Sequence, residues 1–431
     1  MTQPDTNFLR SFYRALADRP LAPEDPFYVN YLEGTAGDPV AHIGRQIEWA
    51  ETGGMYLLSG HPGSGKSTEL RRLRQMLEEA GCVVFMADMA KYVNMTSAIE
   101  ITDFLVSLMG ALADEVMSRY SANPLAETYW TRFRNFLGSR LELDKVQFGV
   151  EGVTITTSLK EDVTFRQRVQ EKLRGHVAAL VDEAHQFAAG VVDDIRRREG
   201  NPDLKVVFIV DSLEKIRGVG AGAEDVHSSV RNLFAAHASS LNLPSLHVLY
   251  TLPRYVTTLA PNLGSQIGCG ILAIPSIHIF QSHSRDPDPA GQRIMREIVS
   301  RRCGDWEAVF TPESLDRLAT SSGGDLRDFL YLLRYCLVEA SSPSVGLPVP
   351  GRIVEAAENN VRSNMLPIAT EDREWLRRIA ETKQPELQTV DALPALARFF
   401  DAKLVLNYRN GEDWYDVHPL LRDTVDPPHA E

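Results

Sequence analysis

The chain has 431 residues, which is too long for one compact core and suggests two or three domains. Its 44% apolar residues are typical of a folded globular protein, and its net charge is −13. Its acidity argues against a general nucleic-acid coat, because binding to a phosphate backbone depends on clustered lysine and arginine. No apolar run approaches the roughly 20 residues of a membrane span, and the first residues do not resemble a signal peptide, so we expect a cytoplasmic protein.

The first predicted elements lead into a glycine-rich motif. Helices are predicted at 7–18 and 39–52, a strand at 55–58 and a further helix at 68–80. Residues 60–67, between that strand and that helix, read GHPGSGKS and satisfy the P-loop pattern G-x-x-x-x-G-K-[ST] in full. The alternative is a chance glycine-rich turn, and the strand before and the helix after the motif argue against it.

The P-loop predicts a site for ATP and Mg²⁺. Its glycines let backbone N–H groups surround a polyphosphate, and the following helix N-terminus adds positive potential. Lys66 is expected to reach the β- and γ-phosphates, and the Ser67 hydroxyl is expected to bind Mg²⁺. The expected nucleotide-binding residues here are Gly60, His61, Pro62, Gly63, Ser64, Gly65, Lys66, Ser67 and Thr68.

Strands and helices then alternate, which predicts a parallel sheet in a three-layer α/β fold. Strands are predicted at 82–88, 205–211, 246–251 and 271–279, and helices at 97–120 and 225–239. Segment 121–200 departs from this alternation, and we interpret it as an insertion. It contains an aromatic helix, an alternating stretch at 146–156 that predicts a small hairpin, and a long helix at 164–199. Cys82, Cys269, Cys303 and Cys336 lack C-x-x-C spacing and are expected to be reduced thiols.

The last part of the chain is mostly helical. Helices are predicted at 289–302, 312–321, 326–340, 352–363, 371–382 and 390–400. Asn410-Gly411 between two alternating arms over 403–417 predicts a hairpin, and the last two helices with this hairpin suggest a winged-helix-like module. The expected domains are an N-terminal helical segment (1–38), a P-loop α/β domain (39–287), an all-helical lid (288–366) and the winged-helix-like module (367–431).

Two acidic residues follow the buried strand predicted at 205–211. Five apolar residues precede Asp211, which is the pattern of an acid that holds Mg²⁺ beside a P-loop. Glu214 is the candidate for polarising the attacking water. The alternative for Asp211 is a simple strand-end cap.

A helicase-like signature, Asp-Glu-Ala-His at 182–185, has a different explanation. Apolar residues recur around it at spacings of three and four, which indicates the core face of an amphipathic helix. In helicases this signature ends a strand. We therefore interpret it as a coincidence, with its polar side chains directed largely towards solvent.

Two further positions are candidates for contact with a γ-phosphate. Thr251 ends a predicted strand, where an ordinary strand-end threonine is an equal alternative. Gly323 and Gly324 should end one helix and Asp325 should cap the next, which leaves Arg327 in its first turn. The guanidinium of Arg327 could reach the phosphate, and the alternative is a solvated helix arginine.

With these residues assembled, the chain resembles the AAA+ superfamily over residues 40–362. It is most similar to the origin-recognition-like branch and to STAND, KAP and NACHT proteins. The resemblance makes 60–67 a Walker A motif, 206–211 a Walker B motif with Glu214 as its displaced acid, and Thr251 sensor 1. It also makes Arg327 the sensor-2 arginine.

Two features depart from most AAA+ ATPases. Ser212 stands where a glutamate usually follows the Walker B aspartate, which implies slow or activator-dependent hydrolysis. Arg231 and Arg254 are candidates for an arginine finger, and either could instead be a surface residue. A hexameric ring therefore does not follow from the sequence.

The resemblance implies a regulatory ATPase that couples Mg-ATP binding and hydrolysis to conformational change and to a partner protein. Bacterial defence or signalling is the implied setting, and homo-oligomers fit it. One alternative is a DNA-directed initiator or loader, and another is a nucleotide-gated scaffold that does not hydrolyse ATP. The acidic C-terminal module favours a protein partner over DNA. A GTPase is not indicated, because the chain lacks the Asn-Lys-x-Asp guanine specifier, and length and lid do not fit a small kinase.

Overall fold

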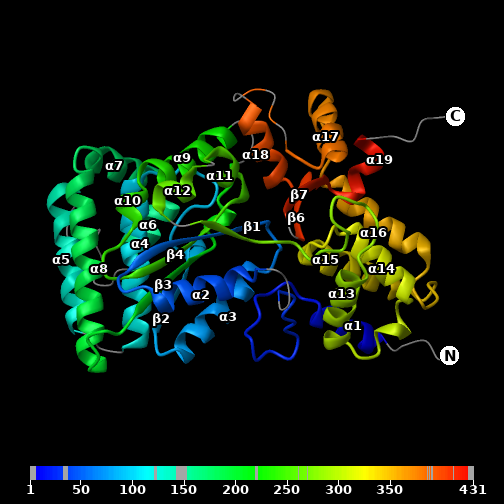
Figure 1. Cartoon of the computed structure of the whole chain (residues 1–431), viewed down its shortest axis with the longest axis horizontal. Coiled ribbons are helices and arrows are strands. Elements are labelled where there is room, and N and C mark those ends of the chain that lie inside the picture. Colours follow the sequence, from blue (N-terminus) through cyan, green and yellow to red (C-terminus); the bar gives the residue numbers. More distant parts are fainter. Residues whose placement is uncertain are drawn as a thin grey trace. The chain divides into compact units, whose positions relative to one another are not determined.

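The computed structural model describes residues 6–32, 37–120, 124–141, 153–218, 222–260, 262–268, 270–385, 387, 389, 392–410 and 412–425. The chain divides into two compact units. The sheet unit comprises Pro39–Ser59 and Arg72–Ala273, and the lid unit comprises Met1–Asp38, Gly60–Arg71 and Ile274–Glu431. Figure 1 shows the elements of both. No helix among the described residues is long and apolar enough to cross a membrane.

The sheet unit is built on a five-stranded sheet. Its strands are β1 (Gly54–Gly60), β2 (Val83–Asp88), β3 (Val206–Asp211), β4 (His247–Leu252) and β5 (Ile271–Ile274), in the order β2-β3-β4-β1-β5. Strands β1 to β4 pair in parallel and are almost wholly buried. They need cover on both faces because parallel sheets bury both.

Helices supply that cover. Helices α2 (Pro39–Trp49) and α3 (Lys66–Glu79) lie on one face of the sheet, and α9 (Ala223–Ala236) and α11 (Arg254–Leu259) on the other (Figure 1). Helix α10 (Ala238–Leu241) and helix α12 (Leu263–Ile267) adjoin α9. The predicted three-layer α/β architecture is therefore confirmed.

The strand register brings polar residues to one edge of the sheet. Asp88 on β2 is the register partner of Asp211 on β3, and Thr251 on β4 is the partner of Leu58 on β1. The carboxyl ends of parallel strands meet at one edge, which is the usual place for ligands in such sheets. The chain leaves β1 at this edge and continues directly into the P-loop.

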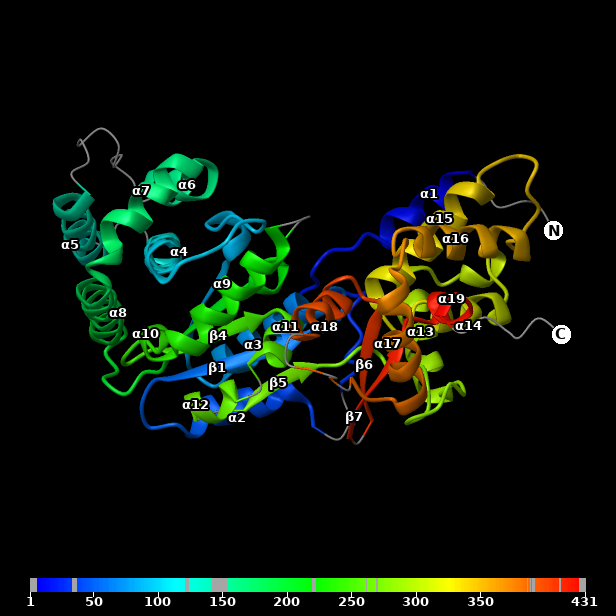
Figure 2. The ribbon, with the colours of Figure 1, turned by 90° about the horizontal axis from the view of Figure 1, so that it is seen from above.

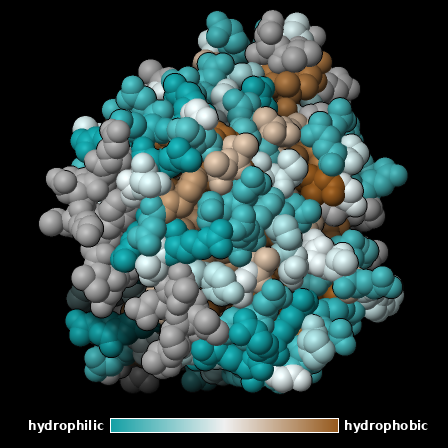
Figure 3. Space-filling model, turned by 90° about the vertical axis from the view of Figure 1, so that its left-hand side faces the viewer, coloured by the Kyte–Doolittle hydropathy of each residue, from teal (hydrophilic) through white to brown (hydrophobic). Residues whose placement is uncertain are grey.

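The insertion is helical in its described part. It contains α5 (Pro124–Leu141), α6 (Val153–Glu161), α7 (Val163–Arg174) and α8 (Val177–Glu199), which pack against the preceding helix α4 (Ile101–Arg119). Its aromatic side chains Trp130, Phe133 and Phe187 are buried against one another, with ring centroids 5.8–6.1 Å apart. Hydrophilic side chains predominate on the face formed by α5, α7 and α8, with only scattered apolar ones (Figure 3). The aromatic residues therefore form a core.

Two predictions within the insertion were wrong. The long helix predicted at 164–199 is two helices, because the chain breaks at Gly175, a residue with poor helix propensity. The hairpin predicted at 146–156 is contradicted at 153–156, which belong to α6, while 146–152 lie outside the described residues. The Asp-Glu-Ala-His signature lies inside α8 as expected, with Asp182 exposed and Glu183 paired to Arg132 at 3.5 Å.

The lid unit contains the expected helices at the expected places. They are α1 (Thr6–Ala15), α13 (Pro289–Arg302), α14 (Pro312–Ser321), α15 (Leu326–Ala340) and α16 (Gly351–Ser363). Asp288, Thr311 and Asp325 each cap the N-terminus of a following helix by accepting a backbone N–H. Aspartate or threonine before an apolar helical pattern is a sequence signal for such a start.

The C-terminal module, here residues 369–425, folds within the lid unit. It consists of α17 (Thr370–Thr382), α18 (Leu393–Asp401), the antiparallel hairpin β6 (Val405–Asn410) and β7 (Glu412–Val417), and α19 (Arg422–Val425). Figure 2 shows the hairpin beside α17. Trp414 is wholly buried against the ring of Tyr408, with centroids 4.5 Å apart, so it is a core residue. Cys82, Cys303 and Cys336 are free thiols, and Cys269 lies outside the described residues.

Candidate nucleotide-binding site

The P-loop has a conformation that depends on its glycines. Gly63 and Gly65 have φ angles of 94° and 83°, in the region that L-residues with a side chain rarely adopt. A Cβ on Gly60 would lie 2.9 Å from both Ile274 O and Ser64 Oγ. The backbone can therefore form this tight loop only with glycine at these positions.

Two polar groups of the loop point to an anionic ligand. Lys66 is 3% exposed, and its Nζ donates to the carbonyl oxygens of Gly60 at 2.9 Å and His61 at 2.8 Å. The Ser64 hydroxyl is buried and has no hydrogen-bond partner among the described residues. A buried polar atom without a partner is costly, and a phosphate oxygen would satisfy it.

Residues before the loop fasten it from the N-terminal side. The Tyr31 hydroxyl donates to Ser64 O at 2.5 Å, and Leu21 N donates to the Thr68 hydroxyl at 3.1 Å. The Tyr28 hydroxyl contacts Glu69 Oε1 at 3.1 Å. Sequence reasoning missed these residues, because a proline-rich segment carries no periodicity that would place it on the P-loop.

A cavity of about 100 Å³ adjoins this N-terminal segment. Within it, Ser276 Oγ and His278 Nε2 are buried and have no hydrogen-bond partner among the described residues. Burial lowers the pKa of His278, so its ring is neutral at neutral pH. The cavity is lined by Tyr31, Leu32, Pro275, Ser276, Ile277, His278, Asp288, Ala290, Gly291 and Ile294.

The turn before α15 packs directly on the P-loop. Gly323 and Gly324 have φ angles of 63° and 79°, and a Cβ on Gly324 would overlap the Ile277 carbonyl oxygen. A Cβ on Gly63 would lie 2.9 Å from Arg327 Cβ. The stem of Arg327 is therefore beside the P-loop, while its Nε donates to Asp18 Oδ2 at 2.7 Å.

The same turn is linked to the C-terminal module. Asp325 is wholly buried, and Lys403 Nζ lies 3.0 Å from oxygens of both Asp325 and Asp328. Burial raises the pKa of Asp325. Burial alone would lower the pKa of Lys403, but the carboxylates of Asp325 and Asp328 raise it above its usual value. This lysine therefore stays charged. In addition, Asn407 N donates to His61 Nε2 of the P-loop at 3.2 Å.

The acidic candidates lie in the sheet unit, on the turn after β3. Asp211 is 4% exposed, and its Oδ1 accepts from Ser212 N at 2.7 Å. Ser212 has a φ of 75°, a left-handed conformation that redirects the chain. Glu214 is 8% exposed, and its Oε2 has no hydrogen-bond partner among the described residues. The turn thus buries Glu214 and leaves its Oε2 able to accept a hydrogen bond.

Thr251 holds this turn. Its hydroxyl is wholly buried, accepts from Leu213 N at 3.0 Å and lies 3.4 Å from Val210 O, to which it donates. Both hydrogen-bonding directions of the hydroxyl are therefore used by backbone. Of the two arginine-finger candidates, Arg254 is 9% exposed, so it is no surface residue, and Arg231 is half-buried on α9.

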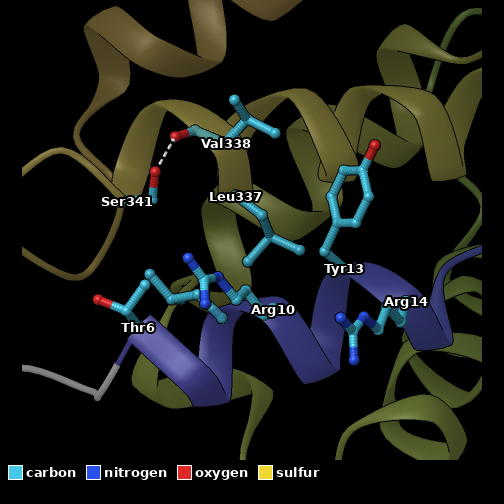
Figure 4. A pocket seen from close by; sticks show the side chains of 8 residues that line it. Thr6, Arg10, Tyr13, Arg14, Leu337, Val338 and Ser341 are labelled. Atoms are coloured by element: carbon cyan, nitrogen blue, oxygen red, sulfur yellow. Dashed lines mark hydrogen bonds between the residues drawn. The ribbon is translucent and has the colours of Figure 1, made fainter.

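A second cavity, of about 220 Å³, lies between α1 and α15 (Figure 4). Arg10 and Arg14 border it from α1, and Leu337 and Val338 from α15. It contains none of the residues predicted to bind nucleotide.

Comparison with known proteins agrees with the P-loop. Residues 48–215, which include the P-loop, match a family described as an AAA domain. No curated protein sequence matches the chain.

Several solved structures match the chain at low sequence identity and with TM-scores below 0.5. The ORC2 protein of Aeropyrum pernix in its ADPNP–ADP complexes has a TM-score of 0.47 at 13% identity, covering 96% of this chain and 95% of that one. A Walker-type ATPase of Pyrococcus abyssi has a TM-score of 0.43 at 13% identity, covering 95% and 99%. Drosophila ORC bound to AT-rich DNA and Cdc6 has a TM-score of 0.38 at 12% identity, covering 94% and 52%.

Proposed function

We propose that the chain is an ATP-binding regulatory ATPase that couples Mg-ATP binding and hydrolysis to a change in how it displays surfaces to a partner protein. The observation that carries the proposal is the P-loop. Its left-handed glycines, its buried Lys66 and the Ser64 hydroxyl, which has no hydrogen-bond partner in the described part of the chain, form a cradle suited to a polyphosphate. The match of residues 48–215 to an AAA domain supports the same class.

Hard oxygen donors fit a magnesium ion. Ser67 is half-buried at the start of α3, and Asp211 presents a buried carboxylate at the end of β3. Hydroxyl and carboxylate oxygens are ligands that Mg²⁺ prefers. When bound, Mg²⁺ neutralises charge on the β- and γ-phosphates. Lys66 adds positive charge at the same phosphates, and Arg327 does so at the γ-phosphate once it leaves Asp18.

Glu214 is proposed to orient and activate the attacking water. Its Oε2 is buried and accepts no hydrogen bond from any described residue, so it can accept one from a water, as a water-positioning carboxylate must. Thr251 is proposed to act through this residue, because its hydroxyl is bound to the turn that carries Glu214. Its earlier interpretation as a direct γ-phosphate contact is less well supported, since backbone groups already use the hydroxyl.

The cavity beside Tyr31 is proposed to receive the base. Ser276 and His278 each offer a buried polar atom that no described residue hydrogen-bonds, and Ile277 and Ile294 offer apolar surface for a ring. A planar base with hydrogen-bonding edges satisfies both. Tyr31 connects this cavity to the loop through its bond to Ser64.

The C-terminal module is proposed to be winged-helix-like and to report the state of the P-loop to a partner protein. Asn407 contacts His61 directly, and Lys403 contacts the turn that packs on Gly63. A role in bacterial signalling or defence, with or without homo-oligomers, is consistent with the resemblance to STAND proteins. The acidic composition of the module favours a protein partner over DNA.

The experiment is a titration of the full chain with a fluorescent ATP analogue and Mg²⁺, using wild type, Lys66→Ala and the control Lys91→Ala. Lys91 is exposed on a short 3₁₀ turn after β2. The proposal predicts binding by wild type and Lys91→Ala and its loss in Lys66→Ala. Equal binding by all three would contradict it. Salt-sensitive binding of duplex DNA by wild type would favour the loader alternative.

A further inference from the structure

A cluster of positive side chains surrounds one buried carboxylate in the lid unit. Asp416 on β7 is wholly buried. Its Oδ2 accepts from Arg285 Nε at 3.1 Å, from Lys383 Nζ at 3.0 Å and from Arg422 Nη2 at 3.2 Å. Its Oδ1 accepts from Arg285 Nη2 at 3.2 Å and from Val417 N at 2.8 Å. We call Arg285, Lys383 and Arg422 the cation cluster.

The cluster carries more positive charge than the carboxylate can balance. A carboxylate offers about four lone-pair sites, and five donors already share those of Asp416. Among the described residues, none of the three cations is paired with another carboxylate. One negative charge against three positive ones leaves an excess of two positive charges, in a chain whose net charge is −13.

Burial makes this excess unfavourable. The side chains of Lys383 and Arg422 are only 12% and 18% exposed, and burial lowers the pKa of each. Arg422 lies over the ring of Phe280, 4.6 Å from its centroid, and its Nε is buried without a hydrogen-bond partner among the described residues. Buried charges are normally paired. The shortage of negative charge in this cluster therefore indicates that a bound anion supplies it.

The cluster remains reachable. The side chain of Arg285 is 37% exposed, and it belongs to the loop between β5 and α13. Lys383 directly follows the end of α17, and Arg422 begins α19. An anion that binds beside Arg285 would thus contact cations from both the loop before α13 and the C-terminal module. Arginine forks and a lysine ammonium are the groups that bind phosphoryl oxygens best.

We propose that the cation cluster is a binding site for a phosphoryl dianion, either inorganic phosphate or a phosphate monoester. Two negative charges balance the excess of two positive ones. A carboxylate or a phosphodiester, each with one negative charge, leaves the cluster half compensated. The bound anion joins the loop of Arg285 to the C-terminal module and so stabilises the lid unit.

The test uses inorganic phosphate and the full chain carrying Lys66→Ala, so that phosphate bound by the P-loop does not contribute. The melting temperature is measured against phosphate concentration at constant ionic strength. Lys383→Met and Arg285→Met are added separately, and Arg398→Met is the control, since Arg398 lies in the same module but is paired with Asp372. Circular dichroism checks that each variant folds. If Lys383→Met does not fold, the comparison is made with Arg285→Met.

The proposal predicts a saturable rise in melting temperature for Lys66→Ala alone and with the control. It predicts at least about tenfold weaker phosphate binding for each cluster variant, since each loses a charge-assisted contact. A linear, non-saturating rise of equal slope in all variants is the general salting effect of phosphate and would overturn the proposal. Duplex DNA binding that Lys383→Met removes, without saturable phosphate binding, would overturn it in favour of a phosphodiester site.

Discussion

Gly63 of the P-loop and Asp325 at the start of α15 are in such close contact that a Cβ on Gly63 would lie 2.5 Å from Asp325 Oδ1. Asp325 is in turn bonded to Lys403, just before the hairpin of the C-terminal module. One buried carboxylate therefore touches the nucleotide loop on one side and the C-terminal module on the other. A movement of the P-loop on nucleotide binding would therefore change the contacts of this carboxylate.

Gly63→Ala is expected to destabilise the chain by about 1–3 kcal/mol and to weaken ATP binding, because it adds a clash with Asp325 to the strain of a positive φ. Gly81→Ala is the matched control, since Gly81 has a φ of 84° but no atom of the described residues lies within 4 Å of its Cβ position. Urea unfolding and ATP titration of both variants separate strain from contact. Equal losses of stability and unchanged ATP affinity would contradict the importance of the contact.

Lys403→Met is expected to lower the free energy of unfolding by about 3–5 kcal/mol, because it leaves Asp325 wholly buried, and Asp328 partly buried, without the lysine that pairs with both. The ion pair between Arg398 and Asp372 serves as control, since the Arg398 side chain is 56% exposed and its removal should cost at most about 1 kcal/mol. Denaturant unfolding of the two variants gives the comparison. A cost for Lys403→Met as small as that for Arg398→Met would show that the buried cluster stabilises little.

Thr251→Val is expected to reduce the rate of ATP hydrolysis more than ATP affinity, since it frees the turn that carries Glu214 and leaves Leu213 N without its acceptor. The loss of that bond should also cost about 1–3 kcal/mol of stability. Thr251→Ser should restore both. If Thr251→Val instead lowered affinity for ATP but not for ADP, direct contact with the γ-phosphate would be the better account.

His247 predicts an acid sensitivity of the sheet unit. Burial lowers its pKa to about 4, below the unfolded value of about 6.5, so the folded state keeps the ring neutral while the unfolded state takes up a proton. The stabilisation is fully present above pH 6.5 and is lost as the pH falls towards 4. At pH 5 the loss is about 2 kcal/mol.

His247→Gln removes the titration and leaves a polar group near the Tyr56 hydroxyl, which lies 3.2 Å from His247 Nδ1. Unfolding free energies of wild type and variant at pH 7.5 and pH 5, and their difference at each pH, give the test. The difference should shift in favour of the variant at the lower pH. A difference that does not change with pH would contradict the assigned titration.

Periodicity and local signals predicted most of the helices and strands. The helix starts at Asp288, Thr311 and Asp325 were predictable because capping residues act on the next turn of backbone. The break at Gly175 was not, since one glycine within a strongly periodic stretch is often tolerated. The segment at 153–156 alternates like a strand but forms a helix, which shows that tertiary packing can override a short pattern.

The candidate site was predictable only in part. The P-loop is a contiguous motif, and its strand and helix can be read locally. The partners that surround it come from distant segments, such as Tyr31 for Ser64 and Lys403 for Asp325. Neither carries a local signal. The role of Thr251 also depended on knowing that its hydroxyl is buried against backbone, which no spacing in the sequence reveals.

We propose that the chain hydrolyses ATP with Glu214 orienting the water. Phosphate release from ATP with Mg²⁺ is measured for wild type and Glu214→Gln, each with a parallel titration of ATP binding. We expect turnover by wild type, and ATP binding by Glu214→Gln with turnover slower by about a hundredfold or more. Hydrolysis by Glu214→Gln at the wild-type rate would contradict the assigned role, and absence of ATP binding by wild type would contradict the account as a whole.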